Sequence, residues 1–254
     1  MAESKRSHPP ALRNTVRKTL LECDVKNKSI LLGLSGGSDS MALLHVLSTL
    51  KNEFGYQLFC CGVNHNLREE AQKELDIARD FCYKLGITFY QKDIYIEGKP
   101  SQDKARNLRY KALRELKEHI NADYICTAHH FEDKAETVLI RIIRGTSVSG
   151  LDVLNTVSSD LIRPMIRAKK RDVMLHISRN NIPYSDDPSN KKTEVYLRSK
   201  VRYEVLPLLA QINPNICDVL CALSESAKDP EISGKKEVRK QKKKEKQKCL
   251  KILP

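Results

Sequence analysis

The sequence predicts an α/β protein built on a Rossmann-like parallel sheet with helices on both faces. Two observations support this prediction. Between residues 29 and 144, short apolar runs of strand length alternate with longer segments whose apolar residues recur at helical spacing. Such alternation calls for parallel strands, because a helix must carry the chain back before the next strand begins. The polar motifs also follow directly after strand-like runs, and parallel sheets bind ligands beyond the carboxyl ends of their strands.

The elements are expected in the following order. Strands cover residues 29–34, 58–64, 87–94 and 123–128, and a fifth covers residues 161–166. Helices follow the first four strands over residues 41–51, 68–85, 103–118 and 131–144. A helix over residues 11–21 precedes the first strand, and helices over residues 169–180, 199–210 and 215–227 follow the last. After Asp229-Pro230 the composition turns to Lys, Glu and Gln. The folded domain is therefore expected over residues 1–228, followed by a basic, disordered tail over residues 229–254.

The formal net charge is +13, and residues 235–251 alone contain ten Lys or Arg against two Glu. A basic body with a basic tail suits a polyanionic partner, and nucleic acid is the usual one. A tail that only aids solubility is the plainer interpretation and stays open. No apolar run approaches the ~20 residues of a membrane span, and the N-terminus has no signal-peptide pattern. A cytoplasmic protein without a membrane partner is expected.

The eight cysteines have irregular spacing, and no Cys-x-x-Cys pair occurs among them. Cys60 and Cys61 are adjacent, and three residues separate Cys217 from Cys221. Reduced thiols are therefore expected, and a zinc or iron–sulfur site is disfavoured.

A glycine-containing loop, Ser35-Gly36-Gly37-Ser38-Asp39-Ser40, lies between the first strand and its helix. Glycines allow a tight turn and close approach of a ligand to the backbone, and a helix N-terminus attracts anions. Ser35, Ser38 and Ser40 add hydroxyl donors, and Asp39 beside phosphates suggests a bridging Mg²⁺. A plain capped turn is the structural alternative, but it would not require two glycines and an acid together. The loop lacks the Lys of a Walker A motif.

The expected helix over residues 131–144 has an apolar stripe and, beside it, two acids. Asp133 and Glu136 are neighbours on one face, and His129 joins them if the helix starts early. These groups could bind an ammonium group or help to hold Mg²⁺, or the acids could simply complement the helix dipole. The stripe expected to face the core consists of Ala135, Val138, Leu139, Ile142 and Ile143.

Two arginines and a histidine are further candidates. Arg106 and Arg109 lie off the apolar stripe of the helix over residues 103–118, where guanidinium groups suit phosphate contact. A surface pair of arginines in salt bridges is nearly as good an interpretation. His65, at the end of the second strand, could contact a nucleotide or could be structural. The stripe itself consists of Ala105, Leu108, Ala112 and Leu116.

The loop over residues 35–40 resembles that of the N-type ATP pyrophosphatases, or PP-loop proteins. Three further segments narrow the resemblance, and together they are similar to the tRNA(Ile)-lysidine synthetases from about residue 12 to about residue 214. These segments are Val63-Asn64-His65-Asn66-Leu67-Arg68, Ala105-Arg106-Asn107-Leu108-Arg109-Tyr110, and the run from Thr127 to Thr137 with Arg144-Gly145 after it. A later segment, residues 186–190 with Arg198 and Arg202, also resembles that family.

The resemblance implies an adenine nucleotide alpha hydrolase-like fold and a ligase that forms a carbon–nitrogen bond. ATP would adenylate the wobble cytidine of tRNA(Ile), and L-lysine would then replace AMP to give lysidine. ATP and Mg²⁺ are the implied cofactors, tRNA(Ile) and L-lysine the implied partners, and a homodimer is possible. The family continues into further tRNA-recognising domains. A related tRNA sulfur-transfer enzyme, which would need Cys-x-x-Cys pairs, and a non-catalytic RNA-binding remnant are the alternatives.

Residue roles follow from the same resemblance. It implies that Asp39, Asp133 and Arg198 act in catalysis, with Asp39 also at the metal. Residues 35–40 and His65 would bind ATP. The substrates would be bound by Asp133, Glu136, Arg106, Arg109 and His129. The family shows two Asp where this chain has Glu132-Asp133, so the resemblance assigns no role to Glu132.

Overall fold

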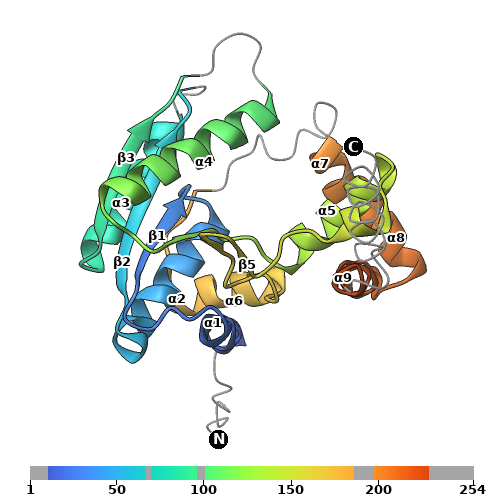
Figure 1. Ribbon diagram of the computed structural model, residues 1–254, viewed down its shortest axis with the longest axis horizontal. Coiled ribbons are helices and arrows are strands. Elements are labelled where there is room, and N and C mark those ends of the chain that lie inside the picture. Colours follow the sequence, from blue (N-terminus) through green and yellow to red (C-terminus); the bar gives the residue numbers. More distant parts are fainter. Residues whose placement is uncertain (1–10, 67–69, 96–100, 186–196, 229–254) are drawn as a thin grey trace, which may run out of the picture. The chain divides into compact units, whose positions relative to one another are not determined.

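The computed structural model describes residues 11–66, 70–95, 101–185 and 197–228 (Figure 1). The chain forms two compact units. The first contains the described residues up to Phe131 together with residues 155–185, and the second contains residues 132–154 and 197–228. The motif over residues 186–190 and the tail over residues 229–254 lie outside the described residues.

The first unit is a six-stranded sheet in the order β3-β2-β1-β4-β6-β5. All neighbouring strands pair in parallel except β5 and β6, which are antiparallel. The strands are β1 (Ser29–Leu34), β2 (Gln57–Asn64), β3 (Thr88–Asp93), β4 (Tyr124–Cys126), β5 (Val157–Ser158) and β6 (Leu161–Ile162). The helices of this unit are α1 (Ala11–Glu22), α2 (Ser38–Phe54), α3 (Glu70–Lys84), α4 (Gln102–His119) and α6 (Lys170–Asn180). The predicted parallel α/β fold is confirmed.

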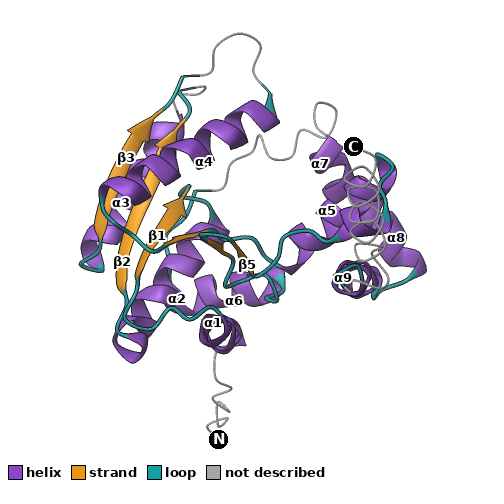
Figure 2. Ribbon diagram, viewed as in Figure 1, coloured by secondary structure: helices purple, strands orange, loops and turns teal. Residues whose placement is uncertain are grey.

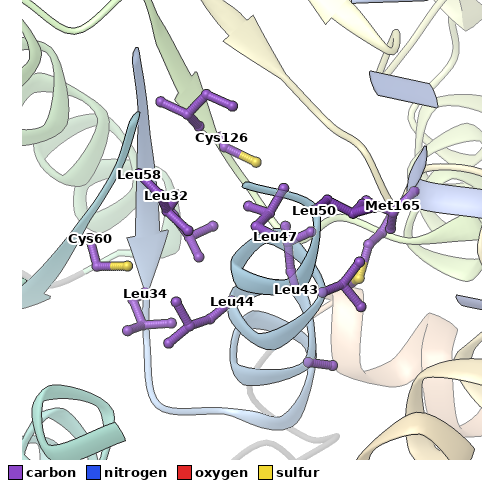
Figure 3. Close-up of a cluster of buried hydrophobic side chains, with 14 of the residues drawn as sticks. Leu32, Leu34, Leu43, Leu44, Leu47, Leu50, Leu58, Cys60, Cys126 and Met165 are labelled. Atoms are coloured by element: carbon purple, nitrogen blue, oxygen red, sulfur yellow. The ribbon is translucent and has the colours of Figure 1, made fainter. Parts of the chain in front are cut away.

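Helices cover both faces of this sheet (Figure 2), as predicted. Alternate residues of β1 point to opposite faces: Leu32 packs in one apolar cluster and Leu31 in the other. The larger cluster joins β1 and β2 to α1, α2, α3 and α6. Figure 3 shows Leu44 and Leu47 of α2 toward Leu34 and Leu32, and Leu43 and Leu50 toward Met165. The smaller cluster joins the other face to α4. The central strand is thus buried on both sides, which explains its continuous apolar sequence.

The second unit is helical. Its helices are α5 (Phe131–Ile143), whose first residue still belongs to the first unit, η1 (Val148–Leu151), α7 (Leu197–Lys200), η3 (Val201–Val205), α8 (Leu206–Ile212) and α9 (Ile216–Ser226). The segments α7, η3 and α8 follow one another without a break, and η3 is a π-helical insertion. Such insertions are frequent at functional sites. The predicted helix over residues 199–210 is therefore longer and wider in its middle turn than expected.

Two expected apolar faces were confirmed only in part. In α5, Ala135 and Val138 are buried as expected, but Ile142 and Ile143 are exposed, and Asp133 and Glu136 are buried. Arginines of α7 and η3 neutralise these acids, as described below, so the acidic face also turns inward. In α4, Tyr110 and Leu113 are buried with Ala112 and Leu116, while Ala105 and Leu108 are only half-buried. Leu113 packs against Leu31 and Ile125 in the smaller cluster.

The fifth expected strand is shorter than predicted. It ends at Ile162, and Arg163-Pro164 then opens a turn closed by hydrogen bonds from Ile166 N to Arg163 O (3.1 Å) and from Ala168 N to Met165 O (2.8 Å). Proline cannot donate to a sheet ladder, which accounts for the early end. The seven cysteines in the described ranges form no disulfide with one another.

Among the described residues, no single helix has the length and composition to cross a membrane. The segments Leu197–Ile212 and Ile216–Ser226 meet that test only when they are joined across a bend of 99°.

Candidate active site

The loop over residues 35–40 leaves β1 and begins α2. Ser40 holds it closed: its hydroxyl donates to Gly37 O (3.0 Å) and accepts from Ser35 N (3.2 Å). A second segment braces the loop, because Ser185 N donates to Gly36 O (2.9 Å). The loop is therefore a preformed turn, and the first N–H groups of α2 lack intrahelical acceptors. An anion is the ligand that such a turn favours.

The two loop glycines serve different purposes. Gly36 has a φ of +78°, and a Cβ on it would collide with the backbone of Glu74 in α3. The fold itself therefore requires glycine at position 36. Gly37 has a φ of −76°, and a Cβ there would meet only Ser35 Oγ at 3.6 Å. Nothing inside the protein requires glycine at position 37, and its missing side chain leaves the backbone open to a ligand.

Lys170, the first residue of α6, reaches into this loop. Its ammonium donates to Ser38 Oγ (2.9 Å) and to Asp39 Oδ1 (2.6 Å). On the other side of Asp39, the buried His130 places Nε2 3.7 Å from Oδ2. The carboxylate of Asp39 is thus flanked by an ammonium and an imidazole. Sequence reasoning did not find Lys170 or His130 as partners of Asp39, because no local pattern links residues 39 and 170.

His65 and the arginines of α4 meet on the same unit. Burial lowers the pKa of His65, and the positive charge of Arg109 lowers it further, so the imidazole is neutral near pH 7. His65 Nδ1 is buried and has no hydrogen-bond partner among the described residues. Arg106 and Arg109 both lie over the ring of Tyr110, at 5.5 and 5.7 Å from its centroid. Arg109 is thus near enough for its charge to act on His65, and a role of either residue in substrate binding stays a prediction.

His129 lies in the loop before α5. Because α5 starts at Phe131, the imidazole does not continue the face of Asp133 and Glu136, which corrects the early-start expectation. Its Nδ1 is instead 2.9 Å from Thr127 Oγ1, at the carboxyl end of β4.

The second unit holds the expected carboxylates and Arg198 together. Asp133 Oδ1 accepts from Arg198 Nη2 (2.9 Å) and from Arg202 Nη2 (2.7 Å). Glu136 accepts from Arg198 Nε (3.0 Å) and from Arg202 Nε (2.5 Å). Two guanidiniums therefore balance two carboxylates, and Glu136 is only 1% exposed. Burial lowers the pKa of Arg202, but the hydrogen bond and charge of Glu136 and the charge of Asp133 raise it overall.

The described residues contain no cluster of three or more His, Cys, Asp or Glu side chains that could hold a metal ion. Asp39 is a single carboxylate at the loop. Mg²⁺ commonly binds through one or two carboxylates plus substrate phosphates, and the chemistry of this loop fits that arrangement.

The chain matches the PP-loop domain family over residues 11–209. This chain belongs to the PP-loop family. The match spans both the loop with Lys170 and the carboxylate–arginine cluster.

Several curated relatives of this PP-loop protein are named tRNA(Ile)-lysidine synthase. The tRNA(Ile)-lysidine synthase of Petrotoga mobilis is 37% identical over 195 residues, which are 74% of this chain and 62% of that protein. The tRNA(Ile)-lysidine synthase of Clostridioides difficile is 34% identical over 212 residues, covering 80% of this chain and 46% of that protein. The chain thus spans about half to three-fifths of the length of these relatives.

A solved structure has the same fold as the PP-loop protein. The U34-tRNA thiolase of Methanococcus maripaludis, solved with its 4Fe-4S cluster, has a TM-score of 0.69 at 21% identity. The superposition covers 85% of this chain and 76% of the thiolase.

Proposed function

We propose that this chain uses ATP to adenylate the wobble cytidine of tRNA(Ile) bearing a CAU anticodon and then joins L-lysine to that base, giving lysidine. One observation supports this most: relatives named tRNA(Ile)-lysidine synthase are 32–37% identical to it over a stretch of 191 to 221 residues. The preformed anion loop of the first unit and the carboxylate cluster of the second unit supply groups of the kinds that the reaction needs.

In the first step, the C2 oxygen of the cytidine attacks the α-phosphate of ATP, and pyrophosphate leaves. The N–H groups at the start of α2, the loop hydroxyls and Lys170 hold the departing phosphates. Asp39 would hold Mg²⁺, which neutralises phosphate charge when bound. This is catalysis by positioning and electrostatic stabilisation, with no covalent role for a side chain.

In the second step, the ε-ammonium of lysine gives up a proton to water, the free amine attacks C2 of the adenylated cytidine, and AMP leaves with the former C2 oxygen on its phosphate. Asp133 and Glu136 would bind the lysine through its ammonium. That ammonium competes with Arg198 and Arg202 for the same oxygens, because the cluster is already balanced in charge. Lysine binding would therefore require one guanidinium to move, most simply onto a phosphate or carboxylate of the incoming substrates.

The further expectations remain part of this proposal. Residues 1–228 would form the catalytic domain, residues 229–254 a basic tail that attracts RNA, and the enzyme would work in the cytoplasm. A homodimer stays a prediction.

The test is incorporation of radiolabelled lysine into tRNA(Ile) with a CAU anticodon, in the presence of ATP and Mg²⁺. ATP-dependent incorporation is expected, and a tRNA(Ile) with a GAU anticodon is the matched control. Binding of ATP without any incorporation would contradict the proposal and would favour the RNA-binding alternative. Transfer of sulfur in place of lysine would favour the sulfur-transfer alternative.

A further inference from the structure

A groove runs along α4 on the first unit, and its residues are far in sequence from the loop over residues 35–40. It has a volume of about 600 Å³. We call it the α4 groove. Four of its lining side chains are cationic and two are acidic. Its lining includes Arg106, Tyr110, Arg114 and Arg163.

Arg163 is the unusual member of the α4 groove. Its side chain is only 6% exposed, and it directly follows β6 at the carboxyl end of that strand. One end is held, because Nη1 donates to Asn155 O (2.7 Å) and to Ser158 Oγ (3.3 Å). Its Nε is buried without a hydrogen-bond partner, and within the described ranges no carboxylate forms an ion pair with it. A buried guanidinium without a counter-charge is costly.

The neighbours of Arg163 add further positive charge to the groove. Arg106, Arg109 and Arg114 each place a guanidinium carbon within 6 Å of the centre of the Tyr110 ring, at 5.5, 5.7 and 5.9 Å. Burial lowers the pKa of Arg163, the Tyr110 phenol acts in the opposite direction, and the charge of Arg106 lowers it again. The hydroxyl of Tyr110 is itself buried beside the Arg163 guanidinium, and among the described residues neither this hydroxyl nor Arg163 Nε has a partner in a well-formed hydrogen bond.

Acidic groups offset only the outer part of the groove. Asp160 lies 4.0 Å from Arg114 and 3.6 Å from Lys117, and Glu115 lies 3.9 Å from Lys111. The Lys111–Glu115 pair is exposed to water and contributes little, whereas the side chains of Lys117 and Asp160 are 20% and 22% exposed. The inner part of the groove, formed by Arg163, Arg106 and the Tyr110 hydroxyl, offers several hydrogen-bond donors and no carboxylate. An anion with several oxygens is the ligand that would satisfy all of them.

We propose that the α4 groove binds phosphate groups of the RNA strand, with Arg163 and Tyr110 donating to one phosphate and Arg106 and Arg114 flanking the next. The length of the groove, from Arg106 to Glu118 along α4, suits a strand better than one free ion. Arg109 also lies over the Tyr110 ring, at 5.7 Å from its centroid, which adds to the positive charge beside the groove. The identity of the RNA rests on the proposed function, whereas the phosphate site does not.

The experiment measures binding of a fluorescent anticodon stem-loop RNA with a CAU loop to the full chain, across a series of salt concentrations. Arg163→Gln and Arg114→Gln are each expected to weaken binding, by about tenfold for the buried Arg163. Each should also reduce the slope of log K against log salt by about 0.7 to 1. Arg179→Gln, on an exposed position of α6, is the matched control and should change neither quantity.

Tyr110→Phe gives a test that does not depend on charge. Removing a buried hydroxyl that makes no well-formed hydrogen bond should not lower the Tm of the RNA-free protein, while it should weaken RNA binding several-fold. This variant also keeps the proposal testable if Arg163→Gln fails to fold. A lower Tm with unchanged RNA affinity would assign the hydroxyl a structural role and overturn the site.

The outcomes separate this site from the proposed function. RNA binding that depends on Arg163 and Tyr110, in a protein that incorporates no lysine, would support the groove and contradict the proposed activity. Lysine incorporation with RNA affinity and salt slope unchanged in Arg163→Gln, Arg114→Gln and Tyr110→Phe would contradict the groove and leave the activity standing. A loss of affinity for inorganic phosphate alone, without any effect on RNA, would also overturn it, because the ligand would then be a free ion.

Discussion

The ammonium of Lys170 lies 2.6 Å from Oδ1 of Asp39. The two residues are 131 positions apart in the sequence and meet because α6 begins beside the loop that follows β1. In this arrangement Lys170 balances the charge of Asp39, and it is placed to contact any phosphate that enters the loop. Asp39 and Lys170 therefore act as a pair, with opposite charges directed at one ligand.

Removal of either member should abolish use of ATP. For Lys170→Met we expect a loss of about 10²-fold or more in ATP–pyrophosphate exchange, the size seen when one donor to a developing charge is removed. Lys170→Arg should recover part of that rate because it keeps the charge. Asp39→Ala should abolish exchange while circular dichroism shows an intact fold. Normal exchange by folded Asp39→Ala would remove the assignment of Mg²⁺ to Asp39.

The two loop glycines should respond in opposite ways to alanine. Gly36→Ala forces a Cβ into Glu74 at a positive φ, and we expect a loss of about 1–3 kcal/mol in the free energy of unfolding. Gly37→Ala meets no obstacle in the protein and should change stability by less than about 0.5 kcal/mol. It should nonetheless weaken ATP binding. Urea unfolding and ATP titration of both variants would check this, and unchanged ATP affinity in Gly37→Ala would contradict phosphate binding at the loop.

The carboxylate–arginine cluster should be sensitive to loss of one partner. Arg202→Met leaves Glu136, which is 1% exposed, with fewer donors, so we expect about 3–5 kcal/mol of destabilisation. Arg202→Met combined with Glu136→Gln should recover much of that loss, because no buried charge then stays unmatched. Urea unfolding of the single and double variants measures the coupling. Equal losses in both would show that packing of Arg202, and not charge, is decisive.

A pair of histidines, of which His176 is buried and His45 is half-buried, should make stability depend on pH. His45 Nδ1 lies 3.0 Å from His176 Nε2, and the pKa of both is lowered by burial, that of His176 to about 4. In the unfolded chain His176 binds a proton near pH 6.5, so the unfolded state gains protons first. Stability should be full above pH 6.5 and fall as the pH drops toward 4, by roughly 3 kcal/mol at most.

Unfolding in urea at several pH values would measure this dependence. His176→Gln should flatten the stability profile between pH 6.5 and 4, whereas His119→Gln, at an exposed position of α4, should leave it unchanged. A wild-type profile without a slope in this range would show that the pair is not the titrating element.

The basic tail should contribute to RNA binding through charge alone. Deletion of the residues after Pro230 removes most of the excess positive charge of the chain, and we expect weaker tRNA binding and a smaller salt slope. A variant with the same residues in shuffled order should bind as the wild type does. Unchanged affinity and slope after deletion would leave the tail with a solubilising role.

The sequence by itself determined the parallel α/β fold, the order of its elements and the loop over residues 35–40. These features depend on local sequence patterns, namely the spacing at which apolar residues recur, the length of the apolar runs, and the glycines at a strand–helix turn. The first strand was predicted with its observed bounds, Ser29–Leu34, because a strand buried on both faces is apolar throughout. The resemblance to a known family added the expectation that Asp133, Glu136 and Arg198 act on the substrates.

Only the tertiary structure decided which residues share a site. Lys170 joins Asp39, Arg202 joins Glu136, and Arg163 is buried beside Tyr110, although no spacing in the chain links the members of these pairs. The burial of the acidic face of α5 likewise depends on Arg198 and Arg202, which lie far from it in the sequence. A charged residue can be buried only where an opposite charge or a ligand meets it, and that condition is set by the packing of distant elements, which local pattern does not encode.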